Sequence, residues 1–326
     1  KADQRSAMRA IQIQKYGDRD VLQAVNLPRP EPGETEVLIE IYSAAVNPID
    51  WKLRSGGFRL IYPLKLPAIP GFDLSGIVAE IGANVKKIKV GDAVYARSNK
   101  TGGGTYAEWI ALDEEVVARK PESLSHDMAA AIPLAALTAL QALRNLAGLK
   151  SGQRVLINGA SGGVGMYAVQ IARAMFDARV VATCSATNID FVKSLGAQNI
   201  IDYKTTDPLK SPQSAEAYDC IFDVVMSLNF AQARKRLKPG GTLIGTSLNA
   251  DLLFSLALRN HFSSRKTRLI LVQSNGQDLE DLAELARQGR LKSTIDSVFA
   301  LEEIQAAHER SESGRARGKI VIQVKT

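Results

Sequence analysis

The stretch Val155-Leu-Ile-Asn-Gly-Ala-Ser-Gly-Gly-Val-Gly-Met-Tyr-Ala-Val-Gln-Ile-Ala172 starts as an apolar run, breaks into glycines and resumes with helical spacing. This pattern predicts a buried parallel strand, a tight turn and a helix. Gly162, Gly163 and Gly165 would let a diphosphate approach the backbone and the free N–H groups that begin the helix. Ala160 replaces the first glycine of the G-x-G-x-x-G template, so plain turn chemistry is an alternative. The strand–turn–helix context favours dinucleotide binding.

Beyond Ser151, strand-like apolar runs alternate with helical stretches. The runs are Val155–Ile157, Val180–Cys184, Asn199–Ile201, Cys220–Val225, Thr242–Gly245 and Leu269–Val272. The helical stretches are Gly165–Phe176, Ile189–Leu195, Phe230–Leu237 and Leu252–Arg259. Such alternation, with nearly continuous apolar strands, predicts a parallel sheet covered on both faces. We therefore expect an α/β fold with a Rossmann, doubly wound domain over residues 126–272.

The first 120 residues predict a β-rich domain with short strands. These are Ala10–Gln14, Val37–Ile41, Leu74–Ile81, Ala93–Ala96 and Tyr106–Leu112, set between Gly, Pro and Asn breaks. A helix is expected after Pro48, because proline is tolerated as a first helical residue. An alanine- and leucine-rich helical pattern, 127–146, is interrupted by Pro133 and would connect the domains. An amphipathic helix, Asp278–Gln288, and a closing strand, Lys319–Val324, complete the pattern.

The composition and the apolar patterns predict neither a membrane-spanning nor a secreted protein. A hydrophobic content of 45% with 23% charged residues is that of an ordinary globular chain. No apolar run approaches the roughly 20 residues of a membrane helix. No secretory pattern is present, and residues 1–7 resemble a flexible leader. Cys184 and Cys220 lie in strand-like runs, which predicts buried, inert thiols and a reducing, cytoplasmic compartment.

The net charge is +7, and a basic cluster is formed by Arg259, Arg265, Lys266 and Arg268. This excess suits an anionic cofactor or weak peripheral attraction to an anionic membrane, and a solvated basic face is the alternative. No nucleic-acid partner is expected.

Six further motifs occur along the chain in a fixed order. They are Ala45-Val-Asn-Pro-Ile-Asp-Trp-Lys52, Ile69-Pro-Gly-Phe-Asp-Leu-Ser-Gly76, Val90-Gly-Asp-Ala-Val94, Ala135-Ala-Leu-Thr-Ala-Leu140, Ser194-Leu-Gly-Ala197 with Ile201-Asp-Tyr203, and Gly318-Lys-Ile-Val321. With these motifs the chain resembles the medium-chain dehydrogenase/reductase superfamily, in its zinc-independent quinone oxidoreductase and enone reductase branch. Residues 158–171 and 182–188 are most similar to the chloroplast-envelope quinone oxidoreductase homologue type. The resemblance implies a GroES-like β-rich catalytic domain, 1–125 and 273–326, around the Rossmann domain.

The zinc ligands of the superfamily's alcohol dehydrogenases are missing. Asn47 occupies the position of the first ligand, and Gly71-Phe-Asp73 stands where Gly-His-Glu would be. No cysteine quartet follows residue 90, and His126, His261 and His308 lie in separate segments. Since zinc takes three or four thiolate, imidazole or carboxylate ligands, we expect no metal. Polarising a conjugated carbonyl or quinone by hydrogen bonding remains feasible.

The choice of cofactor depends on the end of the second Rossmann strand. NAD-binding proteins place an acidic residue there, whereas this chain has Ser185, Thr187 and Asn188. Nothing would repel a 2′-phosphate, so NADPH is expected, with Tyr203 against the adenosine end. Relatives supply a lysine at 188 or an arginine at 187, and without either the preference should be softened. Capping of the next helix is the alternative role for Ser185 and Thr187.

The resemblance also implies roles in the catalytic domain. Lys52 would contact the nicotinamide ribose and favour an enolate. Asn47 would donate its amide to the substrate carbonyl or order the turn before Pro48. Tyr62 would relay a proton to the substrate or is an ordinary exposed aromatic. Asp50 would orient a neighbour or cap the helix.

Further cofactor contacts follow from the same resemblance. Gly163 and Val164, with Gly162, would meet the diphosphate, and Val224 the adenosine or ribose. Leu248, Leu271 and Val272 would approach the nicotinamide. Met226 stands where many relatives have glycine, and Arg317 and Lys319 are cofactor neighbours or part of a surface turn.

These expectations combine into one reaction. NADPH would transfer hydride to the β-carbon of an α,β-unsaturated ketone or aldehyde, that is, an enone or enal. An NADPH:quinone reductase and a catalytically idle NADPH-binding protein are the alternatives. A homodimer is expected through the apolar run Leu269–Val272.

Overall fold

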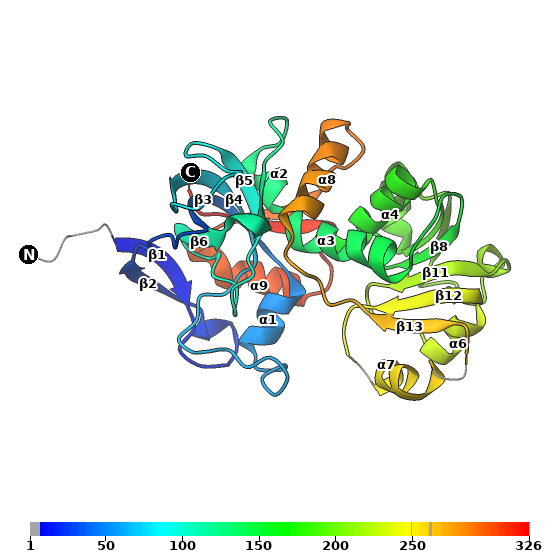
Figure 1. Cartoon of the computed structure of the whole chain (residues 1–326). Helices are drawn as coiled ribbons and strands as arrows, with labels where there is room; N and C mark the ends of the chain where they lie inside the picture. Colours follow the sequence, from blue (N-terminus) through cyan, green and yellow to red (C-terminus); the bar gives the residue numbers. More distant parts are fainter. Residues whose placement is uncertain (1–6, 249, 261–262, 326) are drawn as a thin grey trace, which may run out of the picture. The chain divides into compact units, whose positions relative to one another are not determined.

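The computed structural model describes residues 7–248, 250–260 and 263–325 (Figure 1). The chain folds into two units. The first unit contains Lys1–Ala135, Gln273–Gly289 and Ser293–Thr326, and the second contains Ala136–Val272 and Arg290–Lys292. The chain passes from the first unit to the second within α3 (Pro133–Gln141). Of the expected leader, residues 1–6 lie outside the described residues.

The first unit is built on a mainly antiparallel sheet, as its β-rich sequence predicts. Among the described residues the strand order is β14-β15-β3-β4-β5-β7, with β6 also paired to β3. The bounds are β3 Glu36–Val46, β4 Asp73–Ile81, β5 Ala93–Arg97, β6 Trp109–Asp113, β7 Val117–Arg119, β14 Ile295–Ala300 and β15 Lys319–Gln323. A separate antiparallel pair joins β1 (Ala7–Gln12) to β2 (Gln23–Pro28). Strand β3 lies in the middle of the sheet, and its buried apolar residues form part of the hydrophobic core of this unit.

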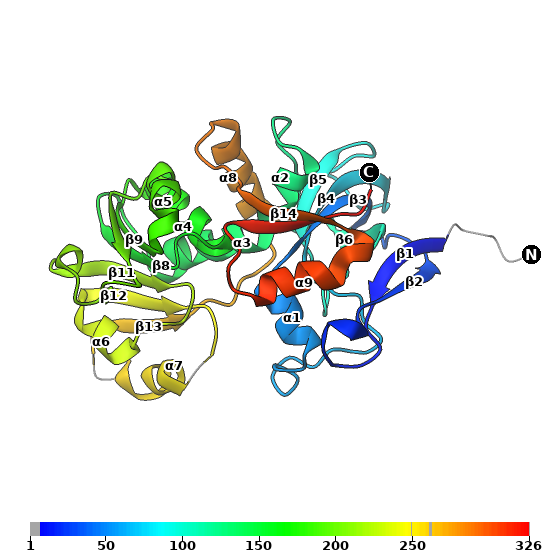
Figure 2. The ribbon, with the colours of Figure 1, turned by 180° about the vertical axis from the view of Figure 1, so that it is seen from behind.

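Most α-helices of the first unit contact this sheet. The helices of this unit are α1 Pro48–Arg54, α2 His126–Ala130, α8 Gly276–Arg287 and α9 Ile304–Glu312. Helix α1 begins at Pro48 as predicted, since the fixed backbone angle of proline suits a first helical residue. Helix α9 was not predicted, and in both ribbon views it lies beside α1 (Figure 2). Segments from the N-terminal and C-terminal parts of the chain thus lie side by side.

The second unit contains the predicted parallel sheet. Its strands are β8 Arg154–Asn158, β9 Arg179–Cys184, β10 Asn199–Asp202, β11 Tyr218–Asp223, β12 Leu237–Gly245 and β13 Lys266–Leu269, in the order β10-β9-β8-β11-β12-β13. The helices are α4 Gly163–Phe176, α5 Ile189–Ser194, α6 Phe230–Lys235 and α7 Ala250–Phe254. Strand order reverses between β8 and β11, which is where doubly wound sheets bind ligands at the carboxyl ends of the strands. The last strand ends at Leu269, so the predicted strand Leu269–Val272 was placed too late.

The predicted helical stretches of the second unit coincide with its helices, apart from a few residues at their ends. Two of the helices in the chain have irregular continuations. Helix α3 continues into a π-helical turn, Ala142–Leu146, and α7 continues into another, Ser255–Arg259. Within the described part of the chain, no helix combines the length and apolarity needed to span a bilayer.

Candidate active site

The glycine-rich loop has the shape that a diphosphate site requires. Gly162 precedes α4 in extended conformation, and Gly159 has a φ of 90°. A Cβ on Gly165 would lie 2.1 Å from the Gly159 carbonyl oxygen, so a side chain there cannot fit. The first backbone N–H groups of a helix have no partner within the helix. Gly163 and Val164, which are half-buried, therefore offer N–H groups that fit an anionic group.

A buried polar network, not predicted from the sequence, holds this loop. Asn158 Nδ2 donates to Asp223 Oδ1 at 2.8 Å, and Thr183 Oγ1 donates to Asn158 Oδ1 at 2.6 Å. The Gly159 N–H in turn donates to Thr183 Oγ1 at 2.9 Å. Each of these polar residues lies at or next to the carboxyl end of a parallel strand, in β8, β9 and β11. That repeated placement is the signal from which the network could have been predicted.

The strand register aligns the carboxyl ends of neighbouring parallel strands, and the predicted cofactor residues follow these ends. Asp223 is paired with Asn158 on β8 and with Gly245 on β12, and Gly245 is paired with Leu269 on β13. Just beyond these strand ends stand Val224, Leu248, Leu271 and Val272. Leu271 is 75% exposed, which leaves it free to contact a ligand or a partner.

The residues expected to contact a 2′-phosphate carry small polar side chains. Ser185 Oγ lies 3.1 Å from Thr187 Oγ1, and Asn188 Nδ2 donates to Ser185 Oγ at 3.2 Å. No side-chain cap hydrogen bond is made by Ser185 or Asn188 to the helical turns that they precede, so the capping alternative gains no support. The Tyr203 N–H donates to the Cys184 carbonyl at 3.2 Å, and the Tyr203 side chain is about half exposed.

Met226 shapes the loop after β11. Its backbone is left-handed, with a φ of 57°, a conformation that costs most residues other than glycine roughly 1–2 kcal/mol. The Thr246 N–H donates to Met226 Sδ at 3.2 Å. A Cβ on Gly245 would lie 2.9 Å from that sulfur, so Gly245 makes room for the thioether.

In the first unit, Asn47 joins Asp73 and Lys319 in a buried cluster. Asn47 Nδ2 donates to Asp73 Oδ2 at 2.9 Å, and Lys319 Nζ donates to Asn47 Oδ1 at 2.5 Å. Lys319 Nζ lies 3.3 Å from Asp73 Oδ2, and the Leu134 N–H donates to Asp73 Oδ1 at 2.7 Å. The Lys319 side chain is buried within the first unit, so it does not belong to a surface turn. Arg317 is exposed, and its N–H donates to Asp296.

This donor set does not fit a zinc ion. The positions of the family's ligands carry Asn47, Phe72 and Asp73, and the Lys319 ammonium already contacts both polar side chains. Among the described residues no group of three His, Cys, Asp or Glu side chains could hold a metal. His261 lies outside the described residues.

Asp50 both caps α1 and binds a distant neighbour. Its Oδ2 accepts from the Asn47 N–H at 2.7 Å and from the Tyr106 hydroxyl at 2.8 Å. Burial raises the pKa of the Asp50 carboxyl to about 7, against the lowering effect of those two hydrogen bonds. The two roles considered from the sequence are therefore both present.

The predicted chemical residues Lys52 and Tyr62 are more open. Lys52 lies on α1, is half-buried, and makes no ion pair with any described residue. Burial lowers the pKa of its ammonium. Tyr62 is 41% exposed and follows Leu60 and Ile61, which are more exposed still. Both side chains are thus accessible within the first unit.

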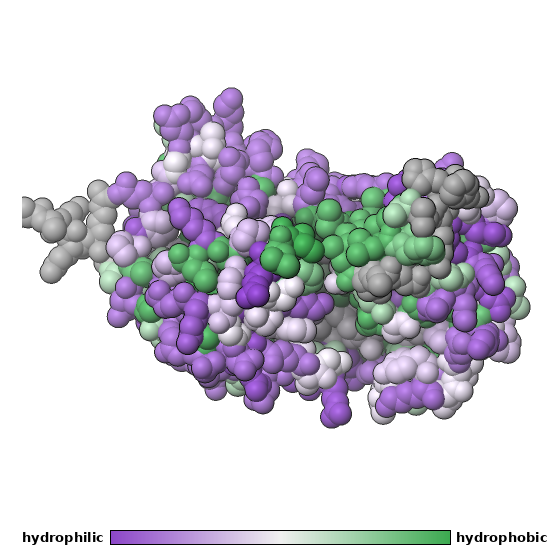
Figure 3. Space-filling view, turned by 90° about the horizontal axis from the view of Figure 1, so that it is seen from below, coloured by the Kyte–Doolittle hydropathy of each residue, from purple (hydrophilic) through white to green (hydrophobic). Residues whose placement is uncertain are grey.

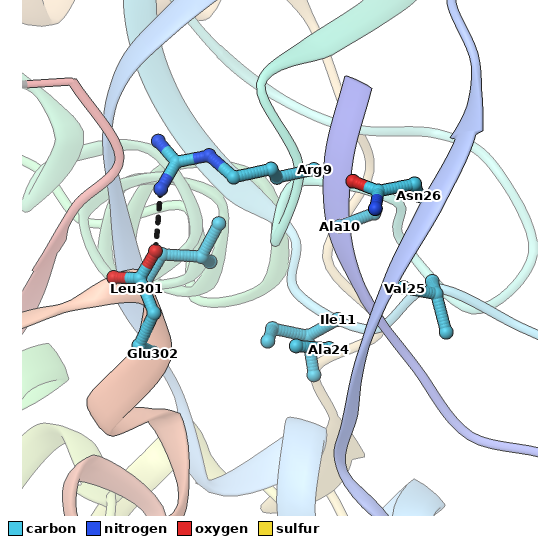
Figure 4. A pocket seen from close by; sticks show the side chains of 8 residues that line it. All are labelled: Arg9, Ala10, Ile11, Ala24, Val25, Asn26, Leu301 and Glu302. Atoms are coloured by element: carbon cyan, nitrogen blue, oxygen red, sulfur yellow. Dashed lines mark hydrogen bonds and ion pairs between the residues drawn. The ribbon is translucent and has the colours of Figure 1, made fainter. Parts of the chain in front are cut away.

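The structure also describes the two cysteines and a pocket of the first unit. Both cysteines are free and buried, and burial raises the thiol pKa to about 11 for Cys184 and about 12 for Cys220, so they are inert as predicted. A pocket of about 230 Å³ between β1, β2 and the 3-10 turn Leu301–Glu303 is bridged by the ion pair Arg9–Glu302 at 2.5 Å (Figure 4). None of the predicted site residues lines it.

The basic cluster of the second unit is only partly free. Arg265 Nε donates to the Leu237 carbonyl and Lys266 Nζ to that of Asn260, whereas Arg268 is exposed. The Arg259 side chain lies outside the described residues. Leu253 and Phe254 of α7 are about half exposed, and Figure 3 shows apolar surface gathered on the face seen from below.

Two known protein families match segments of this chain, and these segments include residues of both units. Residues 33–122 match the alcohol dehydrogenase GroES-like domain, and residues 195–322 match the zinc-binding dehydrogenase family. Although that second family is described as zinc-binding, this chain lacks a fitting donor set among its described residues.

Individual relatives cover nearly the whole chain. It is 38% identical to the chloroplast envelope quinone oxidoreductase homolog of Arabidopsis thaliana, over 97% of this chain and 98% of that one. It is 34% identical to a mitochondrial NAD(P)H oxidoreductase of Bos taurus (98% and 90% covered) and 36% identical to the 2-methylene-furan-3-one reductase of Solanum lycopersicum (97% and 79%).

Among solved structures, the quinone oxidoreductase from Coxiella burnetii superposes with a TM-score of 0.87 at 34% identity, covering 98% of this chain and 100% of that chain. The relatives support oxidoreductase activity with a nicotinamide cofactor and a small-molecule substrate. With its GroES-like and Rossmann units, the chain belongs to the medium-chain dehydrogenase/reductase superfamily, among the quinone oxidoreductase homologues.

Proposed function

We propose that this protein is a zinc-independent, NADPH-dependent reductase of the activated C=C bond in α,β-unsaturated ketones and aldehydes. The observation that carries the proposal is the cluster Asn47–Asp73–Lys319, in which an ammonium contacts the polar side chains at the family's metal-ligand positions. Such a site favours hydrogen-bond polarisation of a carbonyl over metal-assisted oxidation of an alcohol.

Residues of the second unit would bind the cofactor. The N–H groups of Gly163 and Val164 would hold the diphosphate at the start of α4. Ser185, Thr187 and Asn188 would surround a 2′-phosphate with neutral donors. Neutral hydrogen bonds contribute about 1 kcal/mol each, against about 1.5–3 for charge-assisted ones, so the preference for NADPH over NADH should be moderate.

Residues of the first unit would act on the reacting groups. Bound NADPH supplies a hydride to the electrophilic β-carbon. Lys52 would donate to the hydroxyl groups of the nicotinamide ribose, and its positive charge would favour negative charge on the substrate oxygen. Asn47 donates one Nδ2 hydrogen to Asp73, and its second Nδ2 hydrogen would donate to the substrate carbonyl. Tyr62 or water would protonate the α-carbon.

A deuterium-labelled cofactor tests this proposal. NADPH carrying deuterium at the transferred position would be incubated with an enone, an enal and a quinone, and the products examined by NMR. Deuterium on the β-carbon of the enone and enal is expected. Turnover of the quinone alone would favour the second candidate, an NADPH:quinone reductase, which the quinone oxidoreductase relatives support. Cofactor binding without turnover of any of the three would identify an idle binding protein.

Two assembly proposals accompany the enzymatic one. Strand β13 is an edge of the described sheet, and Leu271 beside it is exposed, which supports a homodimer through this edge. Light scattering on the purified protein tests it. Arg268 with exposed Leu253 and Phe254 supports weak attraction to anionic membranes, and salt-sensitive sedimentation with anionic liposomes tests that.

A further inference from the structure

Helices α1 and α9 meet through matched pairs of polar side chains. Asp50 and Arg54 are four residues apart on α1, and His308 and Glu312 are four apart on α9, so each pair shares a helix face. Arg54 Nη1 lies 3.0 Å from His308 Nδ1, and Arg54 Nη2 lies 2.8 Å from Glu312 Oε1. Tyr106 links the two helices on the inner side, with its hydroxyl 3.3 Å from His308 Nε2 and 2.8 Å from Asp50 Oδ2.

Arg54, His308, Tyr106 and Asp50 form a series of hydrogen bonds. The direction of each bond follows from which atoms can donate. Arginine has donors only, so His308 Nδ1 accepts from Arg54 and the imidazole hydrogen resides on Nε2. Burial, together with the charge of Arg54, lowers the pKa of His308 to about 3, so the imidazole is neutral. His308 Nε2–H therefore donates to the Tyr106 oxygen, and the Tyr106 O–H donates to Asp50 Oδ2. All donors point towards Asp50.

The Asp50 carboxyl is buried without enough partners for a carboxylate. Its Oδ1 is buried and makes no hydrogen bond among the described residues. The Lys319 ammonium, whose charge acts on Asp50, is paired with Asp73, and Arg54 is paired with Glu312. The charged and titratable groups around Asp50 come from five elements and one loop. They are Lys52 and Arg54 on α1; Asp73 on β4; Arg97 on β5; Tyr106 in the loop before β6; His308 and Glu312 on α9; and Lys319 on β15. Asp73 and Glu312 already form ion pairs with Lys319 and Arg54, whereas Asp50 forms none with a described residue, which agrees with its raised pKa.

We propose that Asp50, Tyr106 and His308 are positioning residues for the reductase reaction: the Asp50 carboxyl holds one exchangeable proton, the hydrogen bonds from Tyr106 and His308 set how tightly it is held, and the protonated carboxyl fixes the start of α1, which carries Asn47 and Lys52. This inference rests on the proposed function. When the proton leaves to solvent, an unpaired negative charge remains beside Asn47 and Lys52. That charge disfavours negative charge on the substrate oxygen, so kcat/KM falls as pH rises through neutrality.

Infrared spectroscopy of the purified protein detects the proton without any turnover. The C=O stretch of a protonated carboxylic acid should be present at weakly acidic pH, disappear with a midpoint near neutrality, and be absent from Asp50→Asn. Because the Tyr106 hydroxyl favours the charged form, Tyr106→Phe should move the midpoint to higher pH. His308→Leu, which keeps the Tyr106–Asp50 bond, should move it in the same direction by less. This second variant answers the question if Tyr106→Phe does not fold.

Kinetics then connect the proton to the reaction. The wild-type kcat/KM with an enone should fall roughly tenfold from weakly acidic to weakly alkaline pH, and Asp50→Asn should remove this fall. Tyr95→Phe is the matched control, since Tyr95 is equally buried in the same unit and its hydroxyl donates to the Leu279 carbonyl at 2.5 Å. It should leave both the infrared midpoint and the pH profile unchanged.

The outcomes separate the two proposals. A carboxyl band that titrates as expected, in a protein that reduces no enone or enal, would contradict the proposed function and leave the proton on Asp50 established. The absence of any band that Asp50→Asn removes would overturn the inference even if reductase activity is high. A midpoint that neither Tyr106→Phe nor His308→Leu moves would also overturn it.

Discussion

The Lys319 ammonium lies 3.3 Å from Asp73 Oδ2, and the two side chains are only 3% and 0% exposed. Strands β15 and β4, from opposite ends of the chain, thus share one buried ion pair. Removing one partner leaves the other charge buried and unpaired, whereas removing both can be neutral.

Lys319→Met should therefore lower the free energy of unfolding by about 3–5 kcal/mol. The double variant Asp73→Asn with Lys319→Met should recover a large part of that loss, because no buried charge remains. Chemical denaturation of the wild type, both single variants and the double variant measures the cycle. Additive losses would show that the two charges do not interact.

Asp50 should make stability depend on pH in a direction opposite to that of ordinary carboxylates. Its pKa is raised from 3.8 to about 7 by burial, so the folded protein holds a proton that the unfolded chain releases. The stability this provides is complete below the unfolded pKa and is lost as pH rises through about 7. Across that window the wild type should lose on the order of 4 kcal/mol relative to Asp50→Asn, since one pKa unit is about 1.4 kcal/mol. Denaturation at several pH values checks this, and parallel curves for the two proteins would refute it.

Lys52→Ala should weaken NADPH binding and lower kcat/KM. Loss of a charge-assisted contact costs about 1.5–3 kcal/mol, which corresponds to roughly 10–100-fold. Lys15→Ala is a matched control, because Lys15 is an exposed lysine of the same unit. Cofactor titration by fluorescence, with steady-state kinetics, measures both effects. If Lys52→Ala behaves like Lys15→Ala, the role given to Lys52 is wrong.

Asn188→Lys should strengthen the preference for NADPH over NADH. A cation beside the 2′-phosphate would replace a neutral donor, and a gain of about 1 kcal/mol is roughly fivefold in the ratio of kcat/KM values. Ser185→Asp should shift the ratio towards NADH, because a carboxylate repels the phosphate and can bind a ribose hydroxyl. Parallel kinetics with both cofactors test the pair. An unchanged ratio in both variants would place the adenosine end elsewhere.

The second unit could be predicted in most of its detail because its signals are local. A buried strand, a glycine turn and an amphipathic helix follow one another in β8 and α4, and the remaining strands repeat the pattern. The first unit was predicted less completely. Strand β14 is only half-buried, and α9 buries just Ile304, Ala307 and His308, so neither carries a strong periodic pattern.

The polar clusters could not be read from the sequence, because their members are far apart in it. Asn47 and Lys319 are separated by 272 positions, and Arg54 and His308 by 254. Lysine is rarely buried, so sequence reasoning placed Lys319 at the surface or beside the cofactor. Asp50, by contrast, could be recognised as a helix cap because its partner Asn47 is three residues away. Local partners are predictable, and long-range partners require the fold.

The most direct test of the account is NADPH-linked reduction of a conjugated enone by the purified protein, measured with and without a chelator alongside its metal content. We predict that turnover continues at an unchanged rate in the chelator and that zinc is far below one ion per chain. Zinc at one ion per chain, with activity that stops when it is removed and returns when it is restored, would contradict the account.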